Sequence, residues 1–298
     1  MSEAPRVAVV VVSYETRETL LEGLAALEGE PATSVVVVDN ASHDGSAAAV
    51  RDRFPSVRLI ANPENVGFAR ACNQGARESR APFLLFLNPD ATLAPGSLHA
   101  LTALLDAGPQ VGVVGPRTRG ASGTIQVSTG DDLSPLAELR QRRLVRGVAC
   151  QEASVVAEVE AQHAVEREVD WVSGACLLIR RQAFDAVSGF DERFFLYEED
   201  ADLCRRVREA GWKVLYSPAG EARHALGRSM ARAPERARLE YQRSHLLYYR
   251  KHCGLLQRVG LRLWLVARAA LALVHGALSL NGPRTREALA LLRVAVVA

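Results

Sequence analysis

The chain has 298 residues, 48% hydrophobic and 23% charged, with a formal net charge of +2. These fractions exclude wholesale disorder, and the low net charge indicates no global surface for nucleic acid. The length suits one large domain or two modest ones with a sizeable core.

The charge is distributed unevenly along the chain. Residues 223–298 carry 14 Lys and Arg against three acids, whereas residues 1–222 carry 22 bases against 31 acids. An acidic body followed by a basic tail indicates that the two parts meet different partners.

The cysteines and the N-terminus indicate a cytoplasmic protein. The five cysteines are an odd number without a CxxC pair, which argues against a disulfide framework and a zinc ribbon. The first apolar run, residues 7–12, is short and has no basic segment before it, so we expect no signal peptide.

The first 115 residues alternate between strand-like and helix-like segments. Continuous apolar runs predict buried strands, and helical spacing of apolar residues predicts helices between them. We therefore expect an α/β fold with a mainly parallel sheet. The expected strands are 7–12, 34–38, 57–60, 83–87 and 111–114, and the expected helices are 16–27, 47–54, 68–78 and 97–106.

Residues 117–168 differ from the preceding part. They are rich in Gly, Ser and Thr and then in charged residues, with no clear buried strand, so we expect an insertion over the sheet edge. Order returns over 169–179, followed by expected helices at 181–187 and 199–210 and a strand at 213–216.

The tail, residues 236–298, has a helical pattern. Its apolar stretch 261–280 is interrupted by Arg262 and Arg268. A transmembrane helix needs about 20 mostly uncharged residues, so an interfacial helix fits better. A helical pair packed on the main domain is the alternative. We expect a domain at 1–225 and a C-terminal helical region at 226–298.

Polar residues follow several predicted strands, where α/β sheets bind ligands. Asp39 follows four valines and can accept from a nucleobase N–H or a ribose hydroxyl, or it can merely shape the turn. For Ser42 and Asp44, turn formation and capping are the favoured interpretation.

Two residues are candidate metal ligands. Asp90 follows the apolar run 83–87, and a carboxylate at a strand end can hold a divalent cation that bridges a diphosphate. Asn-Pro-Asp is also common turn chemistry. His224 is a second candidate, although a lone His is more often structural.

The predicted helix 199–210 opens with Glu198, Glu199, Asp200 and Asp202. Acids in a first turn suit the helix dipole, but these exceed what capping requires. A carboxylate there stays ionised and can act as a general base toward an incoming hydroxyl.

Several motifs are absent from the sequence. No GxGxxG follows the first strand, which disfavours a dinucleotide oxidoreductase or a methyltransferase. GxxxxGK[ST], HExxH and GxSxG are also missing, which argues against a P-loop NTPase, a zinc protease and an α/β-hydrolase.

Six segments in chain order carry a family resemblance between about residue 7 and residue 250. They are VVVVSYETRETL, VVVVDNASHDGS, NPENVGFARACNQG, FLLFLNPDATLAPG, WVSGACLLIRRQAF and GFDERFFLYEEDADLCRRVREAGWKVLYSP. Together they resemble family 2 glycosyltransferases, most closely the rhamnosyltransferase-like enzymes of bacterial polysaccharide and cell-wall assembly.

The resemblance implies a GT-A fold, a nucleotide-diphospho-sugar donor, and Mg²⁺ or Mn²⁺. Asn88-Pro89-Asp90 occupies the family's Asp-x-Asp position with one carboxylate, so the metal is expected at Asp90 and His224. Glu199 and Asp200 match the catalytic Glu-Asp pair, whose Asp is the general base of inverting members. Residues implied in substrate binding are Tyr14, Glu15, Asp39, Asn40, Asn65, Gly67, Phe68, Arg70, Asn73, Asn88, Gly174 and Ala175.

The resemblance also implies inverting sugar transfer to a hydroxyl of a saccharide or polyprenyl-diphosphate-linked acceptor. L-rhamnose from dTDP-L-rhamnose is the favoured donor, while UDP- and GDP-sugars and the oligomeric state stay open. The alternative is a non-catalytic nucleotide-sugar-binding subunit of an assembly complex. At the inner face of the cell membrane, basic tail residues would meet lipid phosphates or the acceptor diphosphate: Arg228, Arg232, Arg236, Arg238, Arg243, Arg250 and Lys251.

Overall fold

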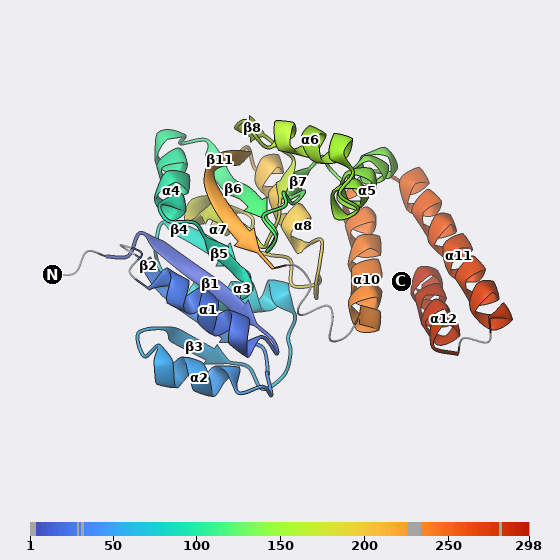
Figure 1. The fold of residues 1–298 in the computed structure, drawn as a ribbon, viewed down its shortest axis with the longest axis horizontal. Coiled ribbons are helices and arrows are strands. Elements are labelled where there is room, and N and C mark those ends of the chain that lie inside the picture. Colours follow the sequence, from blue (N-terminus) through green and yellow to red (C-terminus); the bar gives the residue numbers. More distant parts are fainter. Residues whose placement is uncertain (1–3, 29, 31–32, 226–233, 280–281, 298) are drawn as a thin grey trace.

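The computed structural model describes residues 4–28, 30, 33–225, 234–279 and 282–297. Within these residues, a nine-stranded sheet has the order β3-β2-β1-β4-β10-β6-β11-β5, with β8 beside β11 (Figure 1). Its strands are β1 (Val7–Ser13), β2 (Thr33–Asp39), β3 (Arg58–Ala61), β4 (Phe83–Leu87), β5 (Ala91–Leu93), β6 (Val111–Arg119), β8 (Arg167–Glu168), β10 (Cys176–Arg180) and β11 (Lys213–His224). A separate pair joins β7 (Thr129–Gly130) and β9 (Trp171–Val172).

The first half of the sheet is parallel, as the sequence predicts. β1 pairs in parallel with β2 and β4, and Ser13 lies opposite Asp39 at the carboxyl ends. The second half is mixed, because β10 runs antiparallel between β4 and β6. The start of β10 therefore meets the end of β4, where Cys176 lies opposite Leu87.

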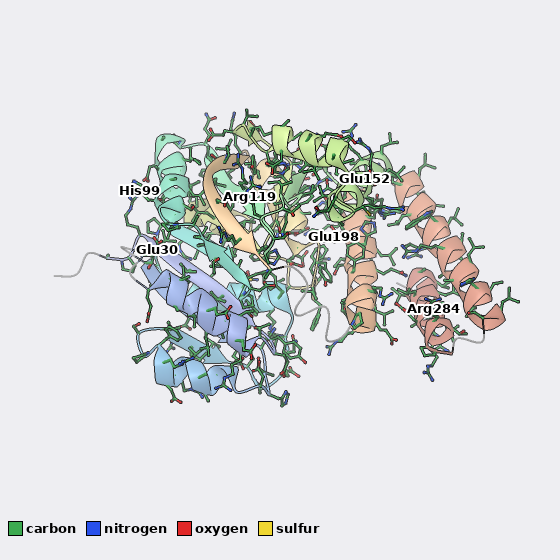
Figure 2. All side chains as sticks on the ribbon, in the orientation of Figure 1. Glu30, His99, Arg119, Glu152, Glu198 and Arg284 are labelled. Atoms are coloured by element: carbon green, nitrogen blue, oxygen red, sulfur yellow. The ribbon has the colours of Figure 1, made fainter. Side chains whose placement is uncertain are left out.

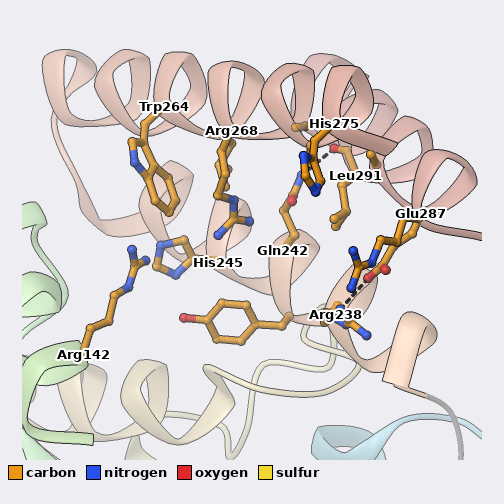
Figure 3. A pocket seen from close by; sticks show the side chains of 15 residues that line it. Arg142, Arg238, Gln242, His245, Trp264, Arg268, His275, Glu287 and Leu291 are labelled. Carbon is orange, nitrogen blue, oxygen red and sulfur yellow. Dashed lines mark hydrogen bonds and ion pairs between the residues drawn. The ribbon is translucent and has the colours of Figure 1, made fainter. Parts of the chain in front are cut away.

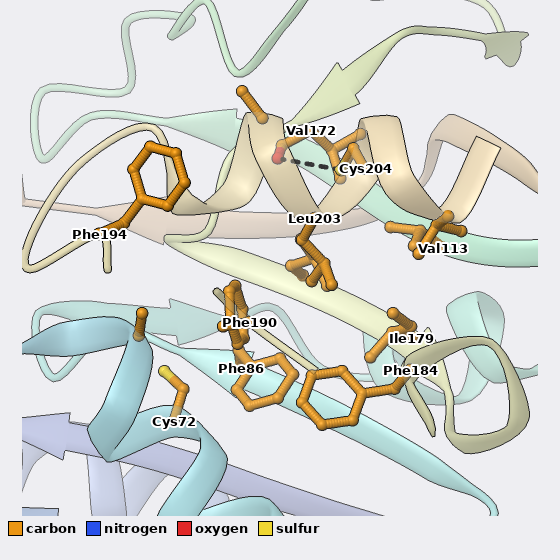
Figure 4. Packing of buried hydrophobic residues seen from close by; sticks show 14 of the residues in the cluster. Cys72, Phe86, Val113, Val172, Ile179, Phe184, Phe190, Phe194, Leu203 and Cys204 are labelled. Carbon is orange, nitrogen blue, oxygen red and sulfur yellow. Dashed lines mark hydrogen bonds between the residues drawn. The ribbon is translucent and has the colours of Figure 1, made fainter. Parts of the chain in front are cut away.

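Six helices cover the two faces of this sheet. Successive residues of β1 alternate between two hydrophobic clusters, because side chains on a strand point to opposite faces. Phe86 and Phe190 meet edge to face at 4.8 Å in the cluster on the α3 side (Figure 4). One face carries α1 (Arg17–Leu27), α2 (Ser46–Arg53) and α4 (Ser97–Ala107), and the other carries α3 (Phe68–Arg77), α7 (Arg181–Ala186) and α8 (Glu199–Glu209).

The expected insertion contains more sheet than the sequence predicted. β6 continues to Arg119, and β11 continues past residue 216 to His224, with an irregular register between Ser217 and Glu221. The sequence pattern did not predict these extensions, because they carry polar side chains in place of an apolar run. Arg119, for example, bonds to Glu221 on the neighbouring strand. The remainder holds α5 (Pro135–Ala149) and α6 (Ala153–Gln162), which share a small apolar cluster.

Among the described residues of the C-terminal region, the helices are α10 (Pro234–His252), α11 (Leu255–Leu278) and α12 (Gly282–Val297). α10 packs its buried Tyr248 and Tyr249 into the cluster on the α3 side. α11 and α12 pack on each other at the far end of the molecule and join the same cluster through Leu261, Leu265 and Ala295 (Figure 1). The predicted boundary at residue 225 adjoins a segment outside the described residues, which includes Arg228 and Arg232, and stays a prediction.

One described helix, over Leu255–Gly276, is long and apolar enough to cross a membrane by length and composition. Only 22% of its most apolar window is buried. Its exposed side includes Leu256, Leu263 and Leu278. Both expectations for the tail therefore keep support, because α11 packs Leu261 and Leu265 into the main cluster and also presents apolar side chains outward.

Candidate active site

Two adjoining cavities open where the parallel strands end. The strand-end cavity, of about 330 Å³, lies beside the ends of β1, β2 and β4. The α8 cavity, of about 400 Å³, lies between α8, β9 and the insertion. Asn88 and His224 line both, so the cavities share a wall. Predicted site residues line the strand-end cavity at Tyr14, Asn40, Asn65, Gly67, Phe68, Asn88, Asp90 and His224, and the α8 cavity at Phe68, Asn88, Gly174, Ala175, Glu199, Asp200 and His224.

Asp39 ends β2 as a buried carboxylate with one oxygen in use. Its Oδ2 accepts the backbone N–H of Ser42 at 3.1 Å, while its Oδ1 has no partner among the described residues. Burial raises its pKa. Asp44 accepts from Ser46 at 3.0 Å, as expected of a capping residue, and Glu15 accepts the N–H of His43 at 2.7 Å. Asp39 thus keeps an acceptor for a ligand, whereas Glu15 and Asp44 hold the turn.

Asn40 positions the opposite wall of the strand-end cavity. Its Oδ1 accepts from the N–H of Val66 at 3.1 Å, and its Nδ2 donates to Asn65 at 3.0 Å. Gly67 follows with φ +88°, where an added Cβ would lie 2.7 Å from the carbonyl oxygen of Phe195. The amide of Asn40 is therefore engaged in shaping this loop.

Asp90 and His224 come together from distant parts of the chain. Their Oδ1 and Nε2 atoms lie 3.2 Å apart, and Asn88 approaches the same imidazole nitrogen at 3.4 Å. Pairing of β5 with β11 produces this contact, because His224 lies opposite Ala91. Within the described ranges no cluster of three or more His, Cys, Asp or Glu residues could hold a metal. The pair fits a cation that takes its other ligands from a diphosphate and water.

Asp202 of the acidic run has a structural environment. It is fully buried and lies 2.7 Å from Arg206, 2.6 Å from Lys251 and 2.7 Å from His252. Burial alone would raise its pKa, but these partners outweigh that effect and lower the pKa. Asp202 therefore binds α8 to α10.

Asp200 presents a carboxylate to the α8 cavity. Its Oδ2 accepts the N–H of Gly174 at 2.8 Å, and its Oδ1 accepts the N–H of Ala201 at 2.8 Å. Burial raises the pKa of Asp200 against the opposing effect of these two donors. A Cβ at residue 174 would lie 3.3 Å from the Asp200 Cβ, so glycine permits this close contact. The carboxylate is fixed in orientation and suited to accept a proton from a hydroxyl in the cavity.

Glu199 lies beside it in the wall of the α8 cavity. It is buried, and its Oε2 has no partner in the described part of the chain. Burial and the neighbouring charge of Asp200 raise its pKa well above the ordinary value. The environment therefore favours a neutral carboxyl, which can donate a hydrogen bond into the cavity.

A carboxylate–imidazole–carboxylate contact, not predicted from the sequence, supports this wall. His245 of α10 is buried, with Nδ1 3.0 Å from Glu198 and Nε2 3.2 Å from Glu138 of α5. Burial alone would lower the pKa of His245, but the two glutamates raise it to about 9. Figure 2 places Glu198 between the α/β part and α10. The sequence signal that could have identified His245 is its place on the apolar face of an amphipathic helix in the tail.

Two residues expected to bind substrate have structural partners instead. Arg70 is exposed and lies 3.7 Å from Glu192. Asn73 exchanges two 2.9 Å hydrogen bonds with the backbone of Phe190 and ties α3 to the loop before α8. The residues of the predicted binding set that line neither cavity are Glu15, Asp39, Arg70 and Asn73.

Comparison with known proteins decides the family. The family model described as Glycosyltransferase like family 2 matches residues 5–241. The chain belongs to this glycosyltransferase family. It is 34% identical over 239 residues to the N-acetylglucosaminyl-diphospho-decaprenol L-rhamnosyltransferase of Mycobacterium tuberculosis, covering 76% of this chain and 78% of that protein. A shorter match, 46% over 56 residues, relates 19% of this chain to 21% of the rhamnosyltransferase WbbL of Escherichia coli.

Solved structures confirm the expected fold of this glycosyltransferase. The Pyrobaculum calidifontis mannosyltransferase PcManGT, solved with GDP-Man and Mn²⁺, superposes with a TM-score of 0.60 at 20% identity, covering 99% of this chain and 87% of that one. The family match spans both cavities and ends within α10, so α11 and α12 lie beyond it.

Proposed function

We propose that this glycosyltransferase moves a sugar, with inversion and metal assistance, from a nucleoside diphosphate to a hydroxyl of a polyprenyl-diphosphate-linked saccharide. The observation that carries the proposal is Asp200, held by two backbone donors in a cavity that adjoins the Asp90–His224 pair. L-rhamnose from dTDP-L-rhamnose is the favoured donor, supported by the relative named for rhamnosyl transfer to a diphospho-decaprenol acceptor.

The strand-end cavity would take the donor. Asp39 is buried at the end of β2, outside the lining of this cavity, and its Oδ1, unpaired among the described residues, would accept a nucleobase N–H or a ribose hydroxyl of the donor. Asp90 and His224 would hold Mg²⁺ or Mn²⁺, which neutralises charge on a leaving diphosphate when bound. Asn88 lies in the wall between the cavities, beside the expected position of the transferred sugar.

The α8 cavity would take the acceptor. Asp200 accepts the proton of the acceptor hydroxyl as its oxygen attacks the anomeric carbon. The bond from that carbon to the diphosphate breaks on the opposite face, and the nucleoside diphosphate leaves. One displacement inverts the configuration and needs no enzyme nucleophile. Because two walls hold the substrates in line, much of the rate comes from positioning.

The place of action follows from the acceptor. A polyprenyl-linked substrate lies in a membrane, and α11 presents exposed Leu256, Leu263 and Leu278. We therefore place the enzyme in the cytoplasm, at the inner face of the cell membrane.

Thermal unfolding with UDP, dTDP, GDP or NAD, each with and without Mn²⁺ or Mg²⁺, tests the donor site. A ligand that binds only the folded chain raises its stability by RT ln(1 + [L]/Kd). We expect a metal-enhanced shift with one nucleoside diphosphate, dTDP first, and loss of the enhancement in Asp90→Ala. A shift with NAD alone, or none at millimolar nucleotide, would contradict the donor assignment.

The alternative is a nucleotide-sugar-binding subunit without turnover. Both interpretations predict nucleotide binding, so the discriminating measurement is transfer of labelled rhamnose from dTDP-L-rhamnose to a lipid-linked N-acetylglucosamine. Nucleotide binding without transfer to this or another lipid-linked saccharide would favour the subunit.

A further inference from the structure

A third cavity, the α11 cavity, lies between α10, α11 and α12 and has a volume of about 490 Å³ (Figure 3). Its lining combines basic and apolar side chains. Glu287 is the one acid among its lining residues in the described part of the chain. The basic residues are Arg142, Arg238, Arg268 and Arg284, and the apolar wall is Leu265, Ala269, Ala272, Ala288 and Leu291.

Two guanidinium groups flank one indole ring in this cavity. Arg142 and Arg268 lie 4.7 and 4.6 Å from the ring centroid of Trp264. Figure 3 shows Arg268 directed from α11 into the cavity. Burial and the nearby charge of Arg142 lower the pKa of Arg268. The two like charges are thus held close together.

The charge of Arg268 is not compensated within the described residues. Arg142 bonds to Glu138 at 2.9 Å and Arg238 pairs with Glu287 at 2.9 Å. Arg268 has no hydrogen-bond or carboxylate partner among the residues that the structure describes. Two guanidinium groups held close together repel each other, and an anion bound between them stabilises both charges. A phosphate suits this place because it offers several hydrogen-bond acceptors to the two groups.

The α11 cavity adjoins the α8 cavity. Arg142 and Tyr241 line both the α11 cavity and the α8 cavity, which also contains Asp200. On the other side, Leu263 and Leu271 of α11 are exposed. Asp200, the two arginines and the apolar surface of α11 therefore border two neighbouring cavities.

We propose that the α11 cavity binds the diphosphate group of an isoprenoid diphosphate, with the attached sugar directed toward Asp200 and the hydrocarbon along α11. This inference rests on the proposed acceptor and adds the place where its diphosphate binds. The lining suits this occupant, because its basic side chains match the diphosphate and its apolar side chains match the hydrocarbon chain.

Calorimetric binding of farnesyl diphosphate to the full chain, at saturating dTDP and Mg²⁺, tests the site. We expect binding to the wild type, and a Kd about tenfold higher in Arg268→Gln, since the variant loses a charged hydrogen-bond donor to the diphosphate. Arg262→Gln removes a charge from the same helix at a position that does not line the cavity and is the matched control, expected to change Kd by less than about twofold. Arg268→Lys should recover part of the affinity.

Further binding measurements distinguish an isoprenoid diphosphate from other phosphate-containing ligands. Inorganic pyrophosphate should bind more weakly than farnesyl diphosphate, and farnesol should not bind measurably. Equal affinity of Arg268→Gln and Arg262→Gln for farnesyl diphosphate would overturn the proposal. So would binding only to vesicles of phosphatidylcholine and phosphatidylglycerol, which would assign the arginines to a membrane surface.

The readout is independent of sugar transfer. Farnesyl diphosphate binding that depends on Arg268 in a chain without transferase activity would count against the proposed function alone. Transfer to a polyprenyl-linked acceptor that Arg268→Gln leaves unchanged in KM would count against the α11 site alone. Nucleotide-induced stabilisation of Arg268→Gln equal to wild type establishes that the variant is folded.

Discussion

The two cavities at the centre of the molecule are built in different ways. The strand-end cavity takes its residues from loops that follow neighbouring parallel strands, with His224 added by strand pairing. The α8 cavity gathers the insertion, the start of β10, the start of α8 and the helix α10. The register of the sheet sets the geometry of the strand-end cavity, whereas buried ion pairs between distant segments set the geometry of the α8 cavity. Substitutions should therefore separate donor binding from acceptor chemistry.

The largest effect is expected at Asp200. Asp200→Asn keeps the shape of the side chain but removes the proton acceptor, so kcat should fall about 10³-fold. Stabilisation by nucleoside diphosphate should stay unchanged, because the strand-end cavity is intact. Steady-state transfer assays and thermal unfolding measure the two quantities. Glu209→Gln, on the exposed side of the same helix, is the control. Full activity in Asp200→Asn would rule out this residue as the base.

The next effect is a pH dependence of stability at His245. Its pKa is about 9 when folded and near 6.5 when unfolded, so the imidazolium stabilises the fold fully below pH 6.5. That contribution is lost as the pH rises toward 9, and amounts to about 3 kcal/mol. Denaturant unfolding of the wild type should show this loss, and His245→Gln should not.

His252→Gln is the matched control for that experiment. His252 also faces a buried acid from α10, but Asp202 retains Arg206 and Lys251 as partners. The wild-type pH dependence should therefore persist in this variant. An identical pH profile for wild type and His245→Gln would show that Glu138 and Glu198 do not stabilise the protonated imidazole of His245.

A smaller effect is expected at Gly67, in the wall of the strand-end cavity. Its φ of 88° and ψ of 166° suit glycine alone, and an added Cβ meets the Phe195 carbonyl. Gly67→Ala should cost about 2 kcal/mol of stability and weaken nucleotide binding. Gly96→Ala, at φ +80° with open space around it, should cost less and leave binding unchanged. Equal losses in both variants would show that backbone conformation alone matters at Gly67.

The smallest effect is expected at Arg70. Its side chain is 56% exposed and its ion pair with Glu192 spans 3.7 Å. Arg70→Gln should change stability by less than about 0.5 kcal/mol and leave the Kd for nucleoside diphosphate unchanged. Thermal unfolding with and without dTDP measures both. Clearly weaker nucleotide binding would restore the role that the family resemblance implied for this residue.

The strand-end half of the site could be predicted from the sequence. Apolar runs locate β1, β2 and β4, and the parallel arrangement brings their polar ends to one edge. Asp39 and Asp90 could also be recognised as residues at strand ends, because each follows a run of apolar residues. The contact of Asp90 with His224 needed the family resemblance, because the extension of β11 carries no continuous apolar signal.

The α8 half could not be predicted to the same degree. The helix dipole suggested a readily ionised Asp200, but burial acts in the opposite direction and depends on the whole fold. Glu138 and His245 are 107 positions apart, and no local periodicity reports such a pairing. The insertion was identified by composition, yet its role as a wall of the cavity follows only from its packing against α10.

The Glu138–His245–Glu198 contact also bears on the order in which the molecule forms. Its members come from α5, the loop before α8, and α10, so it closes only after the chain has been synthesised past residue 245. The parallel strands β1 to β4, by contrast, leave the ribosome early and pair over short sequence separations. We expect a nascent chain to build its sheet first and to complete the wall beside Asp200 last.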